Sequence, residues 1–292
     1  MIKYLKQIAA FFREKNINYF GINRLIQHVE QIKCMTAYMA WQEILKNDKY
    51  NDCRRLARYG FKVYSQADED GIIQEIFHRI GTESRSFIEI GVGDGQDISN
   101  TLFLLQQGWH GVWIEPDPKF SKKIIATFRK ELASGQLVFE NKFVDKENID
   151  RLLAILVPRG EADFLSLDVD GNDYHLIEAI HSISPRVIML EYNAKFAPPL
   201  EWVMKYNATH VWDGTDYFGA SLKSFELLLA KKEYLLVGCN IIGANAFFVR
   251  EDLIGNHFCA DYSAENHYEP ARYWLACGFM SGHQTNLAPR AE

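Results

Sequence analysis

Three glycines that alternate with other residues, Gly91, Gly93 and Gly95, carry the clearest chemical signal in this sequence. They follow a short apolar run at 86–90, which is typical of a buried strand that ends in a turn. Backbone without side chains can approach a ligand closely. A second apolar run ends at Glu115, where a carboxylate can accept hydrogen bonds from both hydroxyls of a ribose. Together these residues predict a site for a nucleoside-containing ligand.

The spacing of the glycines helps to decide which nucleoside is bound. Dinucleotide-binding loops have the pattern Gly-x-Gly-x-x-Gly, whereas this loop reads Gly-x-Gly-x-Gly and contains or adjoins two acids, Glu89 and Asp94. These acids would repel a pyrophosphate and attract a cationic group. The pattern therefore favours S-adenosylmethionine, which carries a sulfonium, over NAD. The alternative is that the glycines only make a tight turn between a strand and a helix.

A second group of polar residues follows two later apolar runs. Asp168 and Asp170 come after the first run, and Glu191 and Asn193 come after the second. Because the carboxyl ends of neighbouring parallel strands face one crevice, these four side chains are predicted to meet there. Four oxygen ligands in a small volume suit Mg²⁺, Mn²⁺ or Ca²⁺. The alternatives are a reaction without metal, or a turn and helix cap at 170–173 with Asp168 touching the cofactor.

A metal at this place would have a defined chemical effect. It would lower the pKa of an acceptor hydroxyl and fix that hydroxyl in place, and a side-chain base would then remove the proton. His175 and His210 are the nearest histidines in the sequence, so both are candidates for the base. Together with Asp168 and Asp170 they form the predicted catalytic set. The sequence alone places neither histidine in the crevice.

A long segment at 194–219 has no clear helix or strand pattern and is rich in aromatic residues. It contains Phe196, Trp202, Tyr206, Trp212, Asp213, Tyr217 and Phe218. A connection of this length is usually functional, and aromatic rings over a crevice stack on sugar rings or exclude water from a reaction. The alternative is that these rings pack a helix at 201–206 onto the core.

Alternating strands and helices must position these residues. Apolar runs predict strands at 86–90, 111–115, 137–140, 164–168 and 187–191. Helical patterns predict one helix that ends at Gly81 and others at about 97–107, 119–132, 147–156, 173–182 and 221–231. Apolar strands separated by helices indicate a parallel sheet covered on both faces. The last two runs, at 234–238 and 246–250, are joined by few residues and therefore must pair antiparallel.

The fold class that follows is α/β, with one large domain at 61–255 that contains all of these motifs. Residues 1–60 are predicted to form two or three helices that serve packing or dimerisation, so a homodimer is compatible with the sequence. Residues 256–292 are predicted to form a C-terminal extension.

The composition excludes several classes of function. The net charge is −6 and no block of Lys or Arg occurs, which disfavours a nucleic-acid partner. No apolar run approaches the roughly 18 residues that a membrane span needs. The five cysteines are widely spaced and form no CxxC pair, which indicates reduced thiols in a cytoplasmic protein.

With these motifs, the sequence from about 64 to 250 resembles the class I S-adenosylmethionine-dependent methyltransferases, and more narrowly their FkbM-type branch. The resemblance is carried by the segments SQADEDG at 65–71, EIGVGDG at 89–95, IEP at 114–116 and LDVDGND at 167–173. It implies a Rossmann-like, seven-stranded, mostly parallel sheet whose last strand is antiparallel. It also implies that the three glycines pass under the methionine part of the cofactor and that Glu115 holds the ribose.

The remaining candidates for cofactor contacts are Gln66, Asp70, Asp168 and Asp145. Asp145 follows the third predicted strand, where it either binds the adenine amino group or caps the next helix. Members of the FkbM-type branch methylate hydroxyl groups of sugars or natural products, so the predicted acceptor is a carbohydrate precursor or a related metabolite. The alternatives are an NAD-dependent oxidoreductase or epimerase, and a non-catalytic binding protein on the same fold.

Overall fold

The computed structural model describes residues 2–14, 20–279 and 287. The C-terminal extension predicted at 256–292 therefore lies partly outside the described residues.

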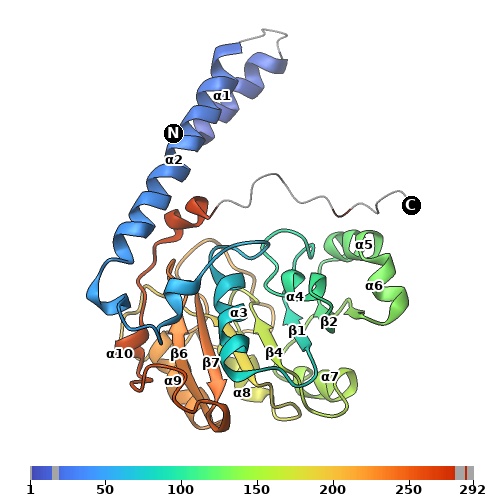
Figure 1. The fold of residues 1–292 in the computed structure, drawn as a ribbon. Helices are drawn as coiled ribbons and strands as arrows, with labels where there is room; N and C mark the ends of the chain where they lie inside the picture. The colour runs from blue at the N-terminus through green and yellow to red at the C-terminus, as the bar shows by residue number, and fades with distance from the viewer. Residues whose placement is uncertain (1, 15–19, 280–286, 288–292) are drawn as a thin grey trace.

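Among the described residues, seven strands form one sheet in the order β3-β2-β1-β4-β5-β7-β6 (Figure 1). The strands are β1 (Ser86–Ile90), β2 (His110–Ile114), β3 (Leu137–Glu140), β4 (Phe164–Leu167), β5 (Val187–Glu191), β6 (Tyr234–Cys239) and β7 (Asn245–Arg250). Only β7 runs against the others, antiparallel to both β5 and β6. The predicted α/β class, the Rossmann-like sheet and the final hairpin are confirmed. The antiparallel strand is last in the chain but not at the sheet edge, because the hairpin places β7 between β5 and β6.

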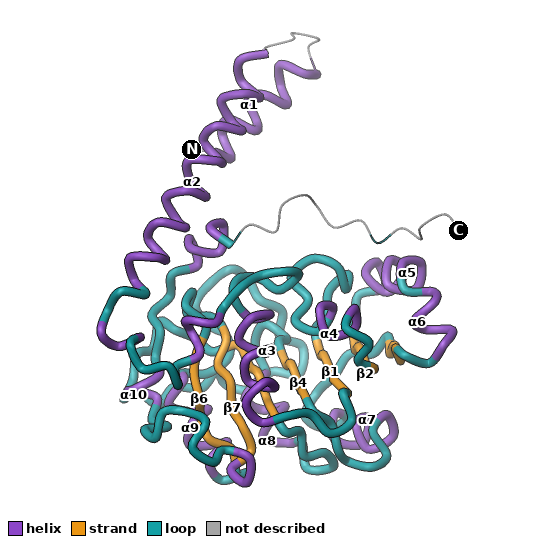
Figure 2. Tube along the Cα trace, viewed as in Figure 1, coloured by secondary structure: helices purple, strands orange, loops and turns teal. Residues whose placement is uncertain are grey.

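Helices and short 3₁₀ turns connect these strands (Figure 2). The α-helices are α1 (Ile2–Glu14), α2 (Phe20–Ile44), α3 (Glu69–Ile80), α4 (Leu102–Gln106), α5 (Pro118–Thr127), α6 (Arg129–Ser134), α7 (Ile149–Leu156), α8 (Asp173–Ala179), α9 (Leu222–Ala230) and α10 (Ala264–His267). The 3₁₀ turns are η1 (Asp48–Tyr50), η2 (Leu56–Tyr59), η3 (Glu251–Leu253) and η4 (Tyr273–Gly278).

Two helices differ from the sequence prediction. The helix predicted at 97–107 begins only at Leu102, so the glycine loop is followed by a long turn. The helix predicted at 119–132 is divided into α5 and α6 at Phe128, whose backbone leaves the helical conformation while its side chain is buried. Burial of this ring in the core explains why the helix does not continue straight through position 128.

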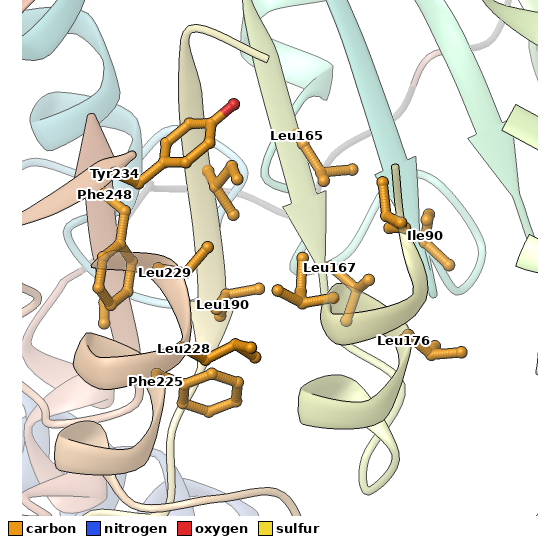
Figure 3. Close-up of a cluster of buried hydrophobic side chains, with 14 of the residues drawn as sticks. Ile90, Leu165, Leu167, Leu176, Leu190, Phe225, Leu228, Leu229, Tyr234 and Phe248 are labelled. Carbon is orange, nitrogen blue, oxygen red and sulfur yellow. The ribbon is translucent and has the colours of Figure 1, made fainter. Parts of the chain in front are cut away.

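The core lies on both faces of the sheet, as the unbroken apolar strands predict. Alternate residues of a strand point to opposite faces. On β5, Ile188 and Leu190 join one buried cluster, whereas Val187 and Met189 join the other. The first cluster brings the strand residues against α8 and α9, including Phe225 (Figure 3). The central strands are therefore held rigidly in place from both sides.

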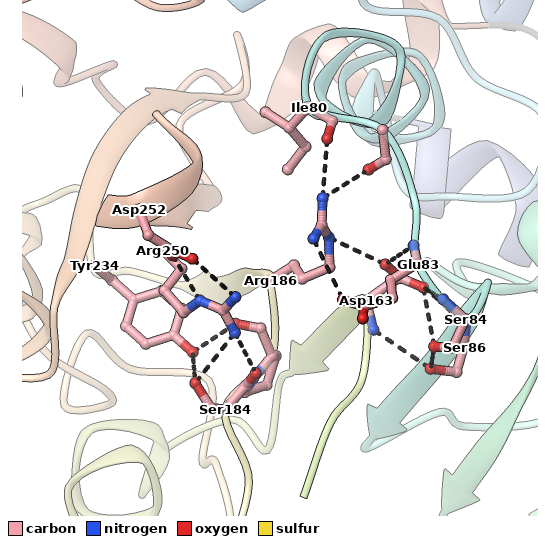
Figure 4. A network of polar contacts seen from close by, with 12 residues as sticks. Ile80, Glu83, Ser84, Ser86, Asp163, Ser184, Arg186, Tyr234, Arg250 and Asp252 are labelled. Atoms are coloured by element: carbon pink, nitrogen blue, oxygen red, sulfur yellow. Dashed lines mark hydrogen bonds and ion pairs between the residues drawn. The ribbon is translucent and has the colours of Figure 1, made fainter. Parts of the chain in front are cut away.

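A polar network holds the amino ends of the same strands, opposite the carboxyl ends at which the site is predicted (Figure 4). Asp163, just before β4, accepts hydrogen bonds from the backbone N–H groups of Glu83 and Ser84 at 2.8 and 2.9 Å. Arg186, just before β5, forms an ion pair with Asp163 at 3.2 Å and donates to the carbonyl oxygen of Ile80 at 2.9 Å. The network thus ties the starts of β1, β4 and β5 to the end of α3.

The helices α1 and α2 pack side by side and project away from the sheet (Figure 1). Lys6 of α1 and Glu30 of α2 form an ion pair at 2.8 Å. At the other end of α2, Trp41 packs against Phe279 with ring centroids 4.5 Å apart. Several large apolar side chains of the two helices are exposed, among them Tyr4, Ile8, Leu25, Ile32, Met35 and Met39. The homodimer and the three-part division of the chain stay predictions.

None of the helices in the described residues is both long enough and apolar enough to span a membrane.

Candidate functional site

The candidate site lies at the carboxyl ends of β1 and β4, where the strand order reverses. In an open α/β sheet such a reversal leaves a crevice at the ends of the strands. The loops that follow these strands are the glycine loop at 91–95 and the acidic loop at 168–173. A Cβ atom on Gly91 would lie 1.7 Å from the carbonyl oxygen of Asp168. The two loops are therefore in direct backbone contact, which explains why position 91 has no side chain.

Glu115 extends from the end of β2 to the glycine loop. Its Oε2 accepts a hydrogen bond from the N–H of Gly93 at 2.9 Å, and its Oε1 accepts from the N–H of Asp117 at 2.8 Å. Burial raises the pKa of Glu115, and these two bonds oppose the rise. Each carboxylate oxygen has two acceptor positions, so each keeps one after these bonds. Gly93 has φ of 61°, and a Cβ there would meet no atom within 4 Å. The space over the loop is open beside this carboxylate.

The side chain of Glu89 does not face that open space. Its Oε1 accepts from the N–H of Asn100 at 2.8 Å, and its Oε2 accepts from the hydroxyls of Ser99 at 2.9 Å and Thr101 at 2.5 Å. Burial raises the pKa of Glu89 to about 7, against the effect of these bonds. The bonds of Glu89 lie within the protein, and its predicted contact with a cationic part of the ligand stays a prediction. Strand β1 turns this residue toward the segment that leads into α4.

The other acid of the glycine loop is also engaged within the protein. Asp94 accepts hydrogen bonds from the N–H groups of Gln96 and Asp97 and forms an ion pair with Lys123 at 3.1 Å. Since α4 begins only at Leu102, no helix N-terminus directly follows the glycines. That helix end is where dinucleotide-binding folds hold the pyrophosphate. The backbone of this loop thus disfavours a dinucleotide, although the repulsion expected from Glu89 does not contribute.

The SQADEDG segment at 65–71 forms the loop before α3 and the first turn of that helix. Oδ2 of Asp70 accepts from the three backbone N–H groups of 63–65 at 2.7 to 2.9 Å. Glu69 is buried and accepts from the side-chain amide of Asn240, in the β6–β7 turn, at 2.6 Å. Asp70 therefore shapes the loop that precedes α3, and its predicted cofactor contact stays a prediction. Gln66 is exposed, and its cofactor contact stays a prediction.

Asp145 bonds the turn before α7, whose N-cap is Asn148, so its predicted capping role stays a prediction. Its Oδ1 accepts from the backbone N–H groups of Glu147 at 3.1 Å and Asn148 at 2.8 Å, in the turn that leads into α7. The adenine contact stays a prediction.

The acids that follow β4 and β5 come together as their spacing predicts. Asp168, Asp170 and Glu191 each offer one carboxylate oxygen, and these oxygens lie within 4.8 Å of one another. Asp170 is exposed, whereas Asp168 and Glu191 are half-buried. In the described part of the chain, none of the ion pairs involves any of the three. In these described residues, no Lys or Arg side chain therefore neutralises the cluster.

The backbone of the acidic loop is bent to bring these carboxylates together. Asp170 has φ of 55°, in the left-handed region that Asp adopts more readily than most residues. The side chain of Asp173 holds the bend, because it accepts from the N–H groups of Val169 and Gly171, both at 2.9 Å. Burial raises the pKa of Asp173 to about 6. Asp173 therefore has a structural role, because its hydrogen bonds hold the backbone that carries Asp170.

The electrostatics of the cluster favour a cation. The pKa values of Asp168 and Glu191 lie well above their ordinary values, first because the surrounding protein removes water and then because the neighbouring acids repel one another. Carboxylates that share a small volume repel unless a positive charge is present. A set of oxygen donors is what Mg²⁺, Mn²⁺ and Ca²⁺ prefer. These three residues fit a divalent metal.

The side chain of Asn193 bonds the backbone of the aromatic segment. Its side-chain Nδ2 donates to the carbonyl oxygens of Asp216 at 2.8 Å and Phe218 at 3.0 Å, and its Oδ1 accepts from the N–H of Lys195 at 3.2 Å. The amide is therefore turned toward the aromatic segment at 194–219 and not toward the acids. These bonds anchor the segment, and the predicted place of Asn193 among the metal ligands stays a prediction.

The structure separates the two candidate histidines. Nε2 of His175 lies 2.8 Å from the carbonyl oxygen of Met204, so this ring nitrogen is already occupied. The imidazole of His210 lies against Gly171. Burial raises the pKa of Asp170, and the nearby His210 opposes that rise. In the described residues, Nε2 of His210 is buried and has no hydrogen-bond partner. His210 is therefore the histidine that adjoins the acidic cluster and keeps a free ring nitrogen.

The aromatic segment is ordered by backbone pairing and not by a helix. The helix at 201–206 is absent, because Val203 pairs with Ala220 in an isolated bridge and the backbone around it bonds to the returning chain. Trp202 stacks on Phe196 with ring centroids 4.2 Å apart, which is a packing role. Trp212, by contrast, is 50% exposed. Some rings of the segment are thus packed and others are open to solvent, and the predicted contact of the open rings with an acceptor stays a prediction.

Two functional neighbours of His210 were missed by the sequence analysis. The side chain of Asn172 donates to the carbonyl oxygen of Asn207 at 2.8 Å and accepts from its N–H at 3.3 Å. Gly171, beside it, adjoins the His210 ring. Both residues had been read only as part of a turn, since Gly and Asn are common in turns. A long-range contact between 171–172 and 207–210 leaves no signal in a single sequence.

No protein-family model and no curated protein matches this sequence. Solved structures with a similar fold include a putative caffeoyl-CoA O-methyltransferase from Staphylococcus aureus, with 11% identity, coverage of 85% of this chain and 99% of that one, and a TM-score of 0.44. Another is an S-adenosylmethionine-dependent methyltransferase from Clostridium acetobutylicum, with 10% identity, coverage of 61% and 88%, and a TM-score of 0.38. A third is the glycopeptide N-methyltransferase MtfA complexed with S-adenosyl-L-methionine, with 13% identity, coverage of 65% and 94%, and a TM-score of 0.37. Functional conclusions for this chain rest on its own geometry.

Proposed function

We propose that this chain is an S-adenosylmethionine-dependent O-methyltransferase of the FkbM-type branch, which works in the cytoplasm with help from a divalent metal. The acceptor is a hydroxyl group of a sugar, a polysaccharide precursor or a related small metabolite. The observation that carries this proposal is the pairing of Glu115 with the open glycine loop, next to three clustered carboxylates at the point where the strand order reverses.

The cofactor site would be formed by the glycine loop and Glu115. The carboxylate of Glu115 keeps two acceptor positions for the ribose hydroxyls, and Gly93 leaves open space over the loop. When bound, S-adenosylmethionine supplies a methyl group on a positively charged sulfur. The negative charge of the neighbouring acidic cluster favours such a cation and disfavours a pyrophosphate. This replaces the argument from Glu89, whose carboxylate is turned away.

The acidic cluster would hold the metal through Asp168, Asp170 and Glu191. The metal, when bound, lowers the pKa of an acceptor hydroxyl and orients it. His210 adjoins this group and has a free Nε2, so it is placed to take the proton that the hydroxyl loses. The exposed rings of Trp212 and Tyr217 would contact the acceptor. Most of the catalysis is then positioning, because the methyl group is already activated.

Replacing Glu115 with Gln is expected to weaken the affinity for S-adenosylhomocysteine by about 10- to 100-fold, since a charged hydrogen bond contributes about 1.5–3 kcal/mol. Glutamine keeps the shape of the side chain and one acceptor oxygen for the loop. Isothermal titration calorimetry measures the change, with Glu178→Gln, an exposed acid on α8, as the charge-matched control. Equal affinity in the Glu115 variant and the control would remove Glu115 from the ribose site.

A further inference from the structure

We propose that Gly171 is a positioning residue, which lacks a side chain so that the imidazole of His210 can lie beside the acidic cluster. The proposal rests on the role given above to His210 in methyl transfer. Gly171 follows Asp170 directly, and its own atoms take no part in the reaction. Its effect is to leave the space that the His210 ring occupies.

The contact between Gly171 and the ring is close. A Cβ atom built on Gly171 would lie 2.2 Å from Cδ2 and 2.8 Å from Nε2 of His210, well inside van der Waals contact. The backbone of Gly171 does not have a positive φ, so alanine is compatible with its conformation. The atoms that would clash belong to the end of a side chain and not to backbone. Alanine at this position is therefore expected to displace the ring and to leave the fold intact.

The segment that carries the His210 ring is bonded to residues 171–172 at two places. Asn172 forms two hydrogen bonds with the backbone of Asn207, at 2.8 and 3.3 Å. The N–H of His210 donates to the carbonyl oxygen of the same Asn207 at 2.9 Å. The carbonyl oxygen of Gly171 itself accepts from the N–H of Gly219 at 3.0 Å. Because Asn207 and Gly219, on either side of His210, are both tied to 171–172, the ring has one defined place.

The ring that Gly171 accommodates has a nitrogen without a hydrogen-bond partner among the residues that the structure describes. A buried nitrogen without a partner costs free energy, and in the described residues Nε2 of His210 is such an atom. A cost of this kind is expected where a ligand supplies the missing partner. The space left by Gly171 holds the ring against the residue that follows Asp170, and the proposal places the acceptor hydroxyl at this ring.

A double-mutant cycle tests whether Gly171 acts through His210. In the wild-type background, Gly171→Ala is expected to lower the single-turnover rate of methyl transfer by about 100-fold, the loss typical of a misplaced catalytic group. In a His210→Ala background the same substitution is expected to change the rate by less than about twofold, because the ring it displaces is gone. Equal losses in both backgrounds would overturn the proposal. Unchanged melting temperatures show that each variant is folded.

The position of the ring is measured separately, in protein without metal, cofactor or acceptor. In ¹H–¹³C spectra of the imidazole groups, the signal of His210 is identified by its loss in His210→Gln. Gly171→Ala is expected to shift this signal and to leave that of His181, an exposed histidine, in place. An unshifted His210 signal would overturn the positioning role. A shifted signal with unchanged methyl transfer would instead overturn the role of His210 in the proposed function.

Discussion

Replacing Asp170 with Asn is expected to lower kcat for methyl transfer by about 100- to 1,000-fold, since metal polarisation of an oxygen contributes several kcal/mol to the barrier. Asp170 provides one of the three carboxylates that lie within 4.8 Å of one another. Asparagine adopts the left-handed backbone conformation of this position as readily as Asp does. The substitution therefore removes a charge without straining the loop. Calorimetry with Mn²⁺ should show weaker binding in parallel with the loss of turnover.

In protein without metal, Asp170→Asn is expected to stabilise the fold. Three carboxylates in a small volume repel one another, so removing one charge is expected to raise the melting temperature in the presence of EDTA. Asp213→Asn is the matched control, because Asp213 is an exposed acid of the neighbouring segment that bonds Thr215 and not the cluster. If EDTA-treated wild-type enzyme, tested with its acceptor, keeps full activity, the metal role of these acids is wrong.

Replacing His210 with Ala is expected to lower kcat by about 100- to 10,000-fold, the usual contribution of a positioned general base. The physical reason is that His210 adjoins the acidic cluster and has a free Nε2, whereas that nitrogen of His175 is occupied by the carbonyl oxygen of Met204. The loss should appear mainly in kcat, since the ring is not expected to bind the cofactor. Steady-state kinetics at saturating S-adenosylmethionine measure it.

The matched variant is His175→Ala, which removes the other candidate base. It breaks a hydrogen bond to the aromatic segment, so a modest rise in KM for the acceptor is expected with a much smaller change in kcat. If the His175 variant loses more kcat than the His210 variant, His175 and not His210 is the general base. Comparable losses in both would show that neither ring acts as the base.

The sheet could be predicted from the sequence, because each strand is marked by a local run of apolar residues. Strand β5 contains an unbroken apolar run at 187–190, and both faces of that strand are buried. The short link between 234–239 and 245–250 permits only an antiparallel pair. The helix after the glycine loop was placed too early, because the side chain of Glu89 takes the N–H of Asn100 and holds 99–101 outside the helix. That interaction joins two separate segments and is invisible to periodicity.

The candidate site was predictable where it depends on strand ends. Asp168, Asp170 and Glu191 meet because parallel strands end at one edge. Side-chain direction within a loop has no such rule, so Asn193 was assigned to the metal although its amide bonds the segment that follows. His210 was a candidate only by nearness in sequence. Its place beside Gly171 depends on the path of a long irregular segment, which single-sequence patterns do not encode.

The most direct test of the account is a pair of calorimetric titrations of the wild-type protein, one with S-adenosylhomocysteine and one with NAD. A sulfur nucleoside in the space over residues 91–95, with its ribose on Glu115, predicts saturable heat with S-adenosylhomocysteine and none with NAD. Saturable heat with NAD, and none with S-adenosylhomocysteine, would contradict the account and favour an oxidoreductase or epimerase on this fold.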